Sequence, residues 1–395
     1  MKSKERIYVY VIALFLVSIN LRIGITSVSP VLETIRNQLG LSNVTVSFLT
    51  AIPVLCMGLF ALFTGKLEGL WGAEKVISFC LVVIGIATCM RVAAHSISVL
   101  LSSAFLLGVG IAIAGPLLSG FIKKKFPNRI GFMIGIYSVG MGTGASLSAG
   151  LTVPLQHVLH DSWNVALASW SVLAVIALIV WSPIARKSQQ AFGSRKNKLP
   201  LKNKKAWLFT LFFGLQAGIF YSVTTWLAPA AHDLGMSNQE AGTLITVFTF
   251  VQMAFSFLIP TLSDYYKNQT FWLVSSTLFA SAGLVFILYP LTSLWFSSIL
   301  LGIGLGGLFP LALMLPLNET NSPQEASSWT AMMQSGGYIV GGCAPVLSGF
   351  VRDIFHTNTP LFLILLVLTV CLLVLTVFMH KRSEGKELLH DEKVY

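Results

Sequence analysis

The chain has 395 residues, of which 55% are hydrophobic and only 10% charged, and its mean hydropathy is +0.78. This composition excludes an ordinary soluble domain and places the protein in a lipid bilayer. The net charge of +11 would suggest a nucleic-acid partner in a soluble protein, but here the basic residues lie between apolar runs, so no nucleic-acid partner is expected.

Twelve apolar runs are long enough, at roughly 20 residues each, to cross a bilayer. They cover residues 8–28, 44–64, 76–94, 98–120, 131–154, 164–185, 206–230, 241–262, 271–290, 294–316, 328–350 and 359–380. The runs are continuous rather than alternating, and backbone polar groups in lipid need internal partners, so helices are predicted and a β-barrel is not. The first run continues without a small-residue cleavage site, so it is expected to remain as a helix. The predicted fold is therefore all-α: an integral membrane protein with twelve transmembrane helices in two pseudo-symmetric six-helix bundles.

The basic residues indicate the orientation of these helices. If the amino terminus lies in the cytoplasm, 22 of the 26 lysines and arginines fall in segments on that side. The exceptions are Arg22, Arg36, Arg91 and Arg352. The sequence therefore predicts a multi-pass protein of the cell (plasma) membrane with both termini in the cytoplasm.

A basic segment divides the chain near its middle. Residues 186–205 contain eight basic residues and no acid, which is typical of a cytoplasmic linker. Four parts are expected: an N-terminal six-helix bundle (1–185), the basic linker (186–205), a C-terminal six-helix bundle (206–380) and a cytoplasmic tail (381–395).

The two halves resemble each other in sequence. Leu107-Gly108-Val109-Gly110 leads to Pro116, and Leu301-Gly302-Ile303-Gly304 leads to Pro310, at one constant offset of 194 residues. Such a repeat predicts a duplicated six-helix unit. Pairs of glycines four apart, which let helices approach closely, occur at Gly131/Gly135, Gly140/Gly144, Gly302/Gly306 and Gly337/Gly341.

One segment after the second predicted helix carries a recognisable pattern. Gly65-Lys66-Leu67-Glu68-Gly69-Leu70-Trp71-Gly72 resembles the cytoplasmic signature of the major facilitator superfamily, with Glu68 where Asp is usual. Asp264 follows the eighth predicted helix in the same way. The resemblance implies a gating role for this cytoplasmic loop, with Gly65, Glu68, Gly72 and Asp264 as its candidate residues.

Several other segments narrow the resemblance to one family. They are Asn20-Leu21-Arg22 followed by Pro30, Pro53-Val54-Leu55-Cys56-Met57-Gly58, Trp226-Leu227-Ala228-Pro229, residues 302–310, and Gln334-Ser335-Gly336-Gly337-Tyr338. Together they resemble the cyanate permease and 2-nitroimidazole exporter family of that superfamily. The resemblance implies transport of a small solute and a central cavity lined by the first helix.

Arg22 is the strongest candidate for binding that solute. A guanidinium keeps its proton, and placing it in hydrocarbon costs about 2.5 kcal/mol or more, so it is expected to face a cavity within the protein. There its donors could bind a small anion or a planar polar group at two points. Two alternatives stay open: Arg22 could bind helix-end carbonyls, or it could extend outward to the membrane surface.

Uncharged polar and aromatic residues within the spans complete the candidate cavity. They are Asn20, Tyr137, Gln216, Tyr221, Trp226, Gln252, Gln334 and Tyr338. For each of them a hydrogen bond between helices is an equal alternative, and Tyr221 and Trp226 could instead be interfacial anchors. Arg91 and Arg352 are expected to extend outward from helix ends, and Lys123, Lys124 and Lys125 to touch anionic lipid headgroups.

The distribution of titratable residues bears on ion coupling. All fifteen acids and all seven histidines map to loops, helix ends or tails. Coupled protons are therefore expected either on a weakly acidic substrate or near an edge residue such as Asp233 or Glu68. The five cysteines lie in apolar runs, and neither a metal-ligand cluster nor a phosphate loop occurs, so no cofactor and no metal are expected.

These observations predict a secondary active or facilitative transporter that moves a small anionic or polar planar solute by alternating access. A cyanate-like anion and a nitroimidazole-like heterocycle both fit, and the direction of transport stays open. The expected partners are this small-molecule substrate, the lipid bilayer and, as a candidate coupling ion, the proton, with the protein as a monomer. A drug or toxin efflux carrier of broader specificity and a transporter-like solute sensor are the alternatives, whereas an enzyme is not expected because the spans lack acids and histidines.

Overall fold

The computed structural model describes residues 4–41, 43–186, 199–236, 238–289, 293–355 and 357–391, and these residues form helices and turns without a β-strand. Their contacts divide the chain into two compact units, which are described separately. The first unit is Met1–Pro200 with Leu317–Ser335, and the second is Leu201–Pro316 with Gly336–Tyr395. This division differs from the expected halves in Leu317–Ser335, which packs with the first unit. Most of the expected linker, residues 187–198, lies outside the described residues.

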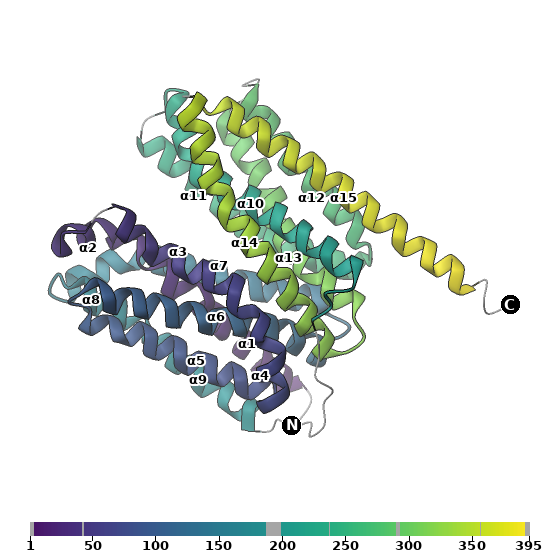
Figure 1. The fold of residues 1–395 in the computed structure, drawn as a ribbon, viewed down its shortest axis with the longest axis horizontal. Coiled ribbons are helices and arrows are strands. Elements are labelled where there is room, and N and C mark those ends of the chain that lie inside the picture. Colours follow the sequence, from purple (N-terminus) through teal and green to yellow (C-terminus); the bar gives the residue numbers. More distant parts are fainter. Residues whose placement is uncertain are drawn as a thin grey trace. The chain divides into compact units, whose positions relative to one another are not determined.

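The helices of the first unit follow the six predicted spans (Figure 1). They are α1 (Lys4–Thr26), η1 (Ser29–Val31), α2 (Leu32–Leu39), α3 (Asn43–Phe60), η2 (Ala61–Phe63), α4 (Thr64–Trp71), α5 (Ala73–Cys89), η3 (Met90–Ala93), α6 (Ile97–Lys125), α7 (Ile130–Val158), α8 (Trp163–Ser169) and α9 (Ser171–Arg186). Three short elements were not predicted: α2, α4 and the separate helix α8 at the start of the sixth span.

The second unit contains the other spans. Its helices are α10 (Lys204–Asp233), α11 (Asn238–Tyr266), α12 (Gln269–Leu288), α13 (Leu294–Glu319), α14 (Pro323–Phe355) and α15 (Thr359–Asp391), of which the end of α13 and the start of α14 belong to the first unit. Among the described residues, eleven helical segments are long and apolar enough to cross a membrane. The remaining predicted span, 328–350, lies inside α14, whose many serines and glycines lower its hydropathy. The predicted all-α membrane fold is confirmed.

The sequence repeat corresponds to a repeated set of helix contacts. A Cβ atom at Gly108 would lie 2.7 Å from Pro53 of α3, and one at Gly302 would lie 2.9 Å from Val251 of α11. Two residues further along α6 and α13, Gly110 and Gly304 face α5 and α12 in the same way. Both units therefore pack their fourth long helix between two neighbours at positions where a side chain would not fit.

Glycines also bring the first and fifth long helices of each unit together. A Cβ atom at Gly144 of α7 would lie 2.4 Å from the Ile19 carbonyl oxygen of α1, and one at Gly341 of α14 would lie 2.7 Å from Ala217 of α10. Hydroxyl pairs add to both contacts: Thr26 with Ser148 at 2.6 Å, and Ser222 with Ser348 at 3.0 Å. The glycine pairs 140/144 and 337/341 thus serve close helix packing, as the sequence predicts.

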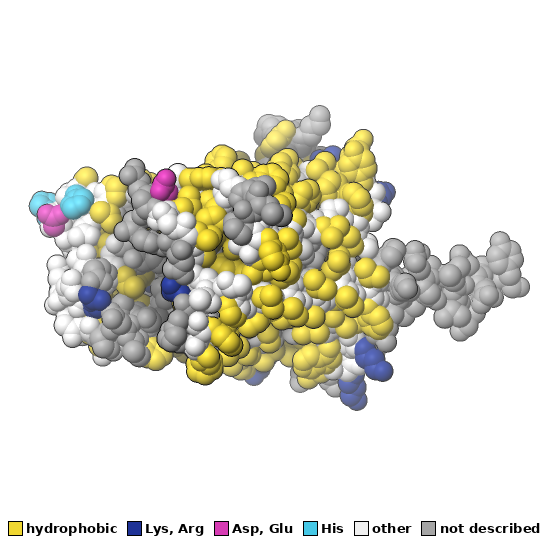
Figure 2. All heavy atoms as spheres, turned by 90° about the horizontal axis from the view of Figure 1, so that it is seen from above, with side chains coloured by type: hydrophobic (Ala, Val, Ile, Leu, Met, Phe, Trp, Pro, Cys, Tyr) yellow, Lys and Arg dark blue, Asp and Glu magenta, His cyan; other side chains and the backbone are white. Residues whose placement is uncertain are grey.

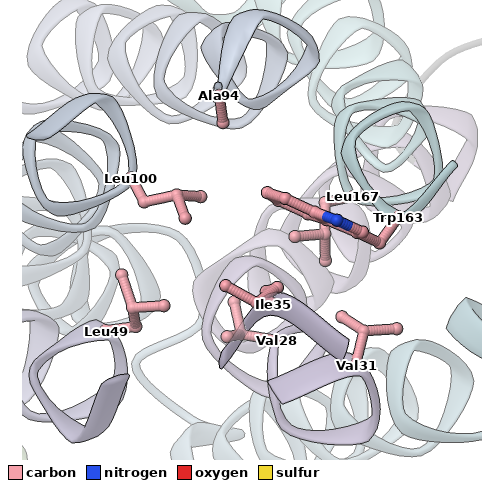
Figure 3. Packing of buried hydrophobic residues seen from close by; sticks show 8 residues of the cluster. All are labelled: Val28, Val31, Ile35, Leu49, Ala94, Leu100, Trp163 and Leu167. Atoms are coloured by element: carbon pink, nitrogen blue, oxygen red, sulfur yellow. The ribbon is translucent and has the colours of Figure 1, made fainter. Parts of the chain in front are cut away.

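An apolar cluster closes one end of the first unit (Figure 3). The Trp163 side chain of α8 lies among aliphatic side chains from several elements: Val28, Val31, Ile35, Leu49, Ala94, Leu100 and Leu167. Its indole Nε1 donates a hydrogen bond to Gln38 Oε1 of α2 at 2.6 Å. The helix α2 ends at Gly40, whose φ of 61° is a conformation that favours glycine. The chain after α1 is therefore a packed helix rather than an open loop.

The outer surface is suited to lipid. Hydrophobic side chains cover much of the described surface on the face shown in Figure 2. Large apolar side chains such as Ile179, Phe250 and Val374 are exposed, each by more than 60%. In water such an extended apolar surface would promote aggregation, whereas in a bilayer it faces hydrocarbon. Cys89, Cys343 and Cys371 are exposed there too, while Cys56 and Cys80 are buried.

Candidate functional site

Arg22 lies near the end of α1, four residues before its last residue, Thr26. Its side chain is half-buried, while its neighbours Leu21 and Ile23 are buried in the bundle. The Thr26 hydroxyl donates to the Arg22 carbonyl oxygen at 3.0 Å and also meets the Ser148 hydroxyl of α7. Together with the close approach of α1 and α7, these bonds fix the backbone from which the guanidinium extends.

Tyr137 lies near Arg22, on α7. Its side chain is buried, with 5% of its surface exposed, and the positive charge of Arg22 acts on its hydroxyl group. The hydroxyl lies 3.8 Å from the point where a Cβ atom at Gly115 of α6 would be. The Tyr137 hydroxyl therefore lies near both Arg22 of α1 and Gly115 of α6.

Gln334 reaches the same point from α14. Its side chain is buried, and its amide Oε1 and Nε2 atoms lie 3.2 Å and 3.9 Å from the Cβ position of Gly115. The surrounding segment is tied to the first unit by two further bonds: Ser335 Oγ donates to the Gly58 carbonyl oxygen, and Lys123 Nζ donates to the Leu317 carbonyl oxygen. The amide of Gln334 is therefore held beside the Tyr137 hydroxyl.

The arrangement combines one permanent cation with two neutral hydrogen-bonding groups. Arg22 supplies N–H donors in a planar fork, and Tyr137 and Gln334 can each donate and accept. Such a set can bind a planar solute that presents negative charge or acceptors at one end and a hydrogen-bonding group at the other. In the described part of the chain, no group of three His, Cys, Asp or Glu side chains could hold a metal ion.

Asn20 has a different environment from the other candidates of the first unit. Its side chain is 1% exposed, and its Nδ2 donates to the carbonyl oxygens of Leu16 and Leu173 at 2.8 and 3.2 Å. These bonds join α1 to α9. They favour a role in helix packing, which was the alternative stated for each polar residue of the spans.

The candidates of the second unit lie on α10, α11 and α14 and contact different neighbours. Gln216 is buried, and its Oε1 has no hydrogen-bond partner among the described residues. The Tyr338 ring packs edge-on against Phe213 at 5.2 Å, whereas Tyr221 packs against the ring of its neighbour Phe220. Gln252 is half-buried, and its backbone faces Gly306 of α13.

Trp226 pairs with a basic residue within the second unit. The guanidinium carbon of Arg352, in the last turn of α14, lies 5.2 Å from the centroid of the Trp226 ring. A Cβ atom at Gly349 would lie 3.1 Å from the same ring. Arg352 is therefore in cation–π contact with Trp226 at a helix end.

Arg91 corrects the prediction made for it. It was expected to extend outward from a helix end, yet only 2% of its surface is exposed. Its Nε donates to Ser103 Oγ at 2.9 Å and its Nη1 to Ser27 Oγ at 3.4 Å. Arg91 follows α5, Ser27 follows α1, and Ser103 lies near the start of α6. The guanidinium turns inward because it can join these three helix ends through hydroxyl groups.

The predicted gating loop is also different in the structure. Residues 64–71 form the helix α4, and the chain turns only at Gly72, whose φ is 82° and whose N–H donates to the Glu68 carbonyl oxygen at 2.8 Å. The Ser327 side chain lies near the Glu68 carboxylate, and its hydroxyl donates to the Pro323 carbonyl oxygen at 3.1 Å. Gly65 lies within this helix, and Asp264 lies in the last turn of α11, so neither belongs to a loop.

The lysines in the last turn of α6, which were expected to touch lipid headgroups, also have partners within the first unit. Lys124 Nζ lies 2.6 Å from Glu74 Oε1, and the Glu74 side chain is almost completely buried. Lys123 donates to the Leu317 carbonyl, and Lys125 lies over the ring of Tyr10 at 5.2 Å. All three amino groups thus have partners inside the protein, and the sequence did not single out Glu74 as one of them.

Comparison with known proteins identifies the family. The model of the Major Facilitator Superfamily matches residues 14–231 and 220–393. The uncharacterized transporter YycB of Bacillus subtilis (strain 168) is 33% identical over 361 residues, 90% of this chain and 89% of that protein. The cyanate transport protein CynX of Escherichia coli (strain K12) is 32% identical over 349 residues, 87% of this chain and 90% of that protein. A 2-nitroimidazole transporter of the same organism is 28% identical over 360 residues, 89% of this chain and 90% of that protein.

Solved structures agree with this fold. The proton:xylose symporter XylE matches with a TM-score of 0.76 and 13% identity, over 96% of both chains. The transporter FucP matches with a TM-score of 0.73 and 13% identity, over 93% of this chain and 98% of that one. The chain therefore belongs to the Major Facilitator Superfamily and, within it, to the family of the cyanate and 2-nitroimidazole transporters, and it is a multi-pass membrane transporter rather than an enzyme.

Proposed function

We propose that the protein carries a small anion or a planar polar solute across the membrane by alternating access, and that Arg22 binds this solute. The observation that supports the proposal most is that the positive charge of Arg22 acts on the Tyr137 hydroxyl, which lies with the Gln334 amide near the Cβ position of Gly115. A charged side chain within the membrane costs free energy unless it binds a solute or a partner in the protein. A cationic solute is disfavoured because Arg22 would repel it.

The relatives support the class of solute. Their names specify cyanate, a small linear anion, and 2-nitroimidazole, a planar heterocycle with a polar nitro group. Both present hydrogen-bond acceptors that a guanidinium can bind. Neither uptake nor export follows from the residues, because gradients and coupling set the direction.

We further propose that both termini lie in the cytoplasm and that the protein resides in the plasma membrane. The lysines and arginines between the spans support this orientation through their bias toward alternate connections. None of Arg22, Tyr137 and Gln334 is a carboxylate or a histidine, the side chains that usually carry coupled protons within a membrane. Proton coupling would therefore rely on a weakly acidic solute or on a residue elsewhere, such as Glu68.

Ligand binding to purified variants tests the role of Arg22. Thermal unfolding would be followed with cyanate, nitrate or 2-nitroimidazole added to the wild type, to Arg22→Ala and to Arg129→Ala. The Arg129 side chain is exposed, so its removal is a matched loss of one charge outside the site. A ligand that binds the folded state raises the unfolding temperature. We expect Arg22→Ala to weaken binding by about tenfold to a hundredfold, the value of one or two charged hydrogen bonds, and Arg129→Ala to leave it unchanged.

Flux measurements complete the test. Wild-type protein in liposomes should exchange a labelled ligand across the membrane, whereas a solute sensor would bind it without flux. Equal binding by the wild type and Arg22→Ala would show that the solute is bound elsewhere. Preferential transport of a lipophilic cation, lost with Arg22, would contradict the proposed solute class.

A further inference from the structure

The glycines of the first unit differ in what an added side chain would meet. Several would meet the backbone of a neighbouring helix: a Cβ atom would lie 2.7 Å from Pro53 Cα at Gly108, 2.9 Å from the Phe15 carbonyl at Gly140 and 2.4 Å from the Ile19 carbonyl at Gly144. These glycines are explained by helix packing.

Gly115 is different. The three atoms nearest to its Cβ position from outside α6 are the Oε1 and Nε2 atoms of the Gln334 amide and the hydroxyl oxygen of Tyr137. All three are polar side-chain atoms, and none belongs to the backbone of a neighbouring helix. Close approach of helices therefore does not explain this glycine, although glycine weakens the interior of a helix relative to alanine.

The proline that follows does not explain it either. Pro116 bends or strains α6, and a glycine before a proline relieves the crowding of the preceding residue. The repeat offset of 194 residues places Phe309 and Pro310 of α13 at the corresponding positions. There a phenylalanine precedes the proline in a continuous helix and contacts Phe213. The helix with its proline thus accepts a large side chain at this position.

We infer that Gly115 determines the size of the solute that the Arg22 site admits. This inference rests on the proposed function and adds a specificity-determining residue to it. Because Gly115 has no side chain, the Gln334 amide can extend into the space beside the Tyr137 hydroxyl. A methyl group at position 115 would lie 3.2 Å from Gln334 Oε1, closer than ordinary contact, and would displace the amide from its present position in the site.

The chemical consequence depends on the size of the solute. A small anion held mainly by Arg22 needs little of the space between the amide and the guanidinium. A nitro-substituted heterocycle fills more of it, so displacement of the amide by a few tenths of an ångström narrows the site for the larger solute first. Gly115 therefore lets the site admit solutes with a planar ring as well as linear anions.

The test compares Gly115→Ala with Gly150→Ala, using cyanate, nitrate and 2-nitroimidazole as ligands. A Cβ atom at Gly150 of α7 would have nothing within 4 Å, so this control makes the same chemical change in open space. In Gly115→Ala the affinity should fall more as the ligand becomes larger, with 2-nitroimidazole losing about tenfold relative to cyanate, as for one methylene in a fitted pocket. Gly150→Ala should leave all affinities unchanged.

A second variant tests whether the effect passes through Gln334. Asparagine at position 334 shortens the side chain by one methylene, so Gly115→Ala should change the ligand preference less in the Gln334→Asn background than in the wild type. An equal loss for every ligand, no loss, or additive effects of the two substitutions would overturn the inference. In those cases the loss of binding in Arg22→Ala would still support the proposed function, and its absence would overturn both.

Discussion

Gly144→Ala provides a direct test of how α1 is held in place. The added Cβ atom would lie 2.4 Å from the Ile19 carbonyl oxygen, and ordinary van der Waals contact begins at 3.4 Å. The contact cannot be relieved by rotating a side chain, because the atom it meets belongs to the backbone of α1. Either α1 recedes from α7 by about 1 Å or both helices bend, at a cost of about 1–3 kcal/mol for overpacking.

The matched control lies on the same helix. Gly150→Ala meets nothing within 4 Å and gains the higher helix propensity of alanine, up to about 1 kcal/mol. Because Gly144→Ala gains the same propensity, the two variants should differ by the overpacking cost alone, about 1–3 kcal/mol in stability and about 2 °C or more in Tm, with Gly144→Ala the less stable. Thermal unfolding in detergent measures the difference.

Ligand binding adds a second result for the same pair. Arg22 is three residues beyond Ile19 on α1, so displacement of α1 should also weaken ligand binding in Gly144→Ala, but not in Gly150→Ala. If both variants unfolded at the same temperature and bound ligand equally well, the close α1–α7 contact would not be what positions Arg22.

Two further predictions concern charges away from the site. Arg91→Met leaves two buried serine hydroxyls without their donor. We therefore expect a loss of about 1–3 kcal/mol in stability and an unchanged ligand affinity. A lower ligand affinity at an unchanged Tm would instead assign Arg91 to the binding site. Lys124→Met leaves the buried Glu74 carboxylate without its cation, and because Lys124 is 41% exposed we expect a modest loss of about 1–2 kcal/mol. Lys125→Met, which removes a contact with a tyrosine ring, is the control, and an equal loss in both variants would argue against the ion pair.

The positions of the long helices can be predicted from the sequence because the length of an apolar run is a local property of the chain. Each of the twelve apolar runs corresponds to helical segments of the structure, apart from a few residues at the ends of the runs and the turn at Trp170. The missed elements are short and depend on tertiary contacts. The helix α2 is stabilised by the cluster around Trp163, and α4 continues the second span to Gly72, where a positive φ finally interrupts it.

The sequence predicts the candidate site less completely than it predicts the helices. Arg22, Gly115, Tyr137 and Gln334 lie on four helices, and hydropathy does not say which helices meet. Arg22, Tyr137 and Gln334 were selected because they are polar residues in apolar spans. Gly115 was missed because many glycines occur in these helices, and only its replacement by phenylalanine at the repeat offset of 194 distinguishes it. The direction of the Arg91 side chain was predicted wrongly for a related reason: the serines that accept its hydrogen bonds are distant in sequence.

Comparison of the two repeats bears on why an arginine stands at position 22. The contacts of Gly144 with Ile19 and of Gly341 with Ala217 place the two helix pairs in the same register. Three residues beyond Ile19 is Arg22, and three residues beyond Ala217 is Phe220, an apolar side chain that is also half-buried. The same packing is therefore formed with a phenylalanine in one repeat and a guanidinium in the other. Since packing alone does not require the charge, and a charge in the membrane is costly, its presence in one repeat favours a role in binding the solute.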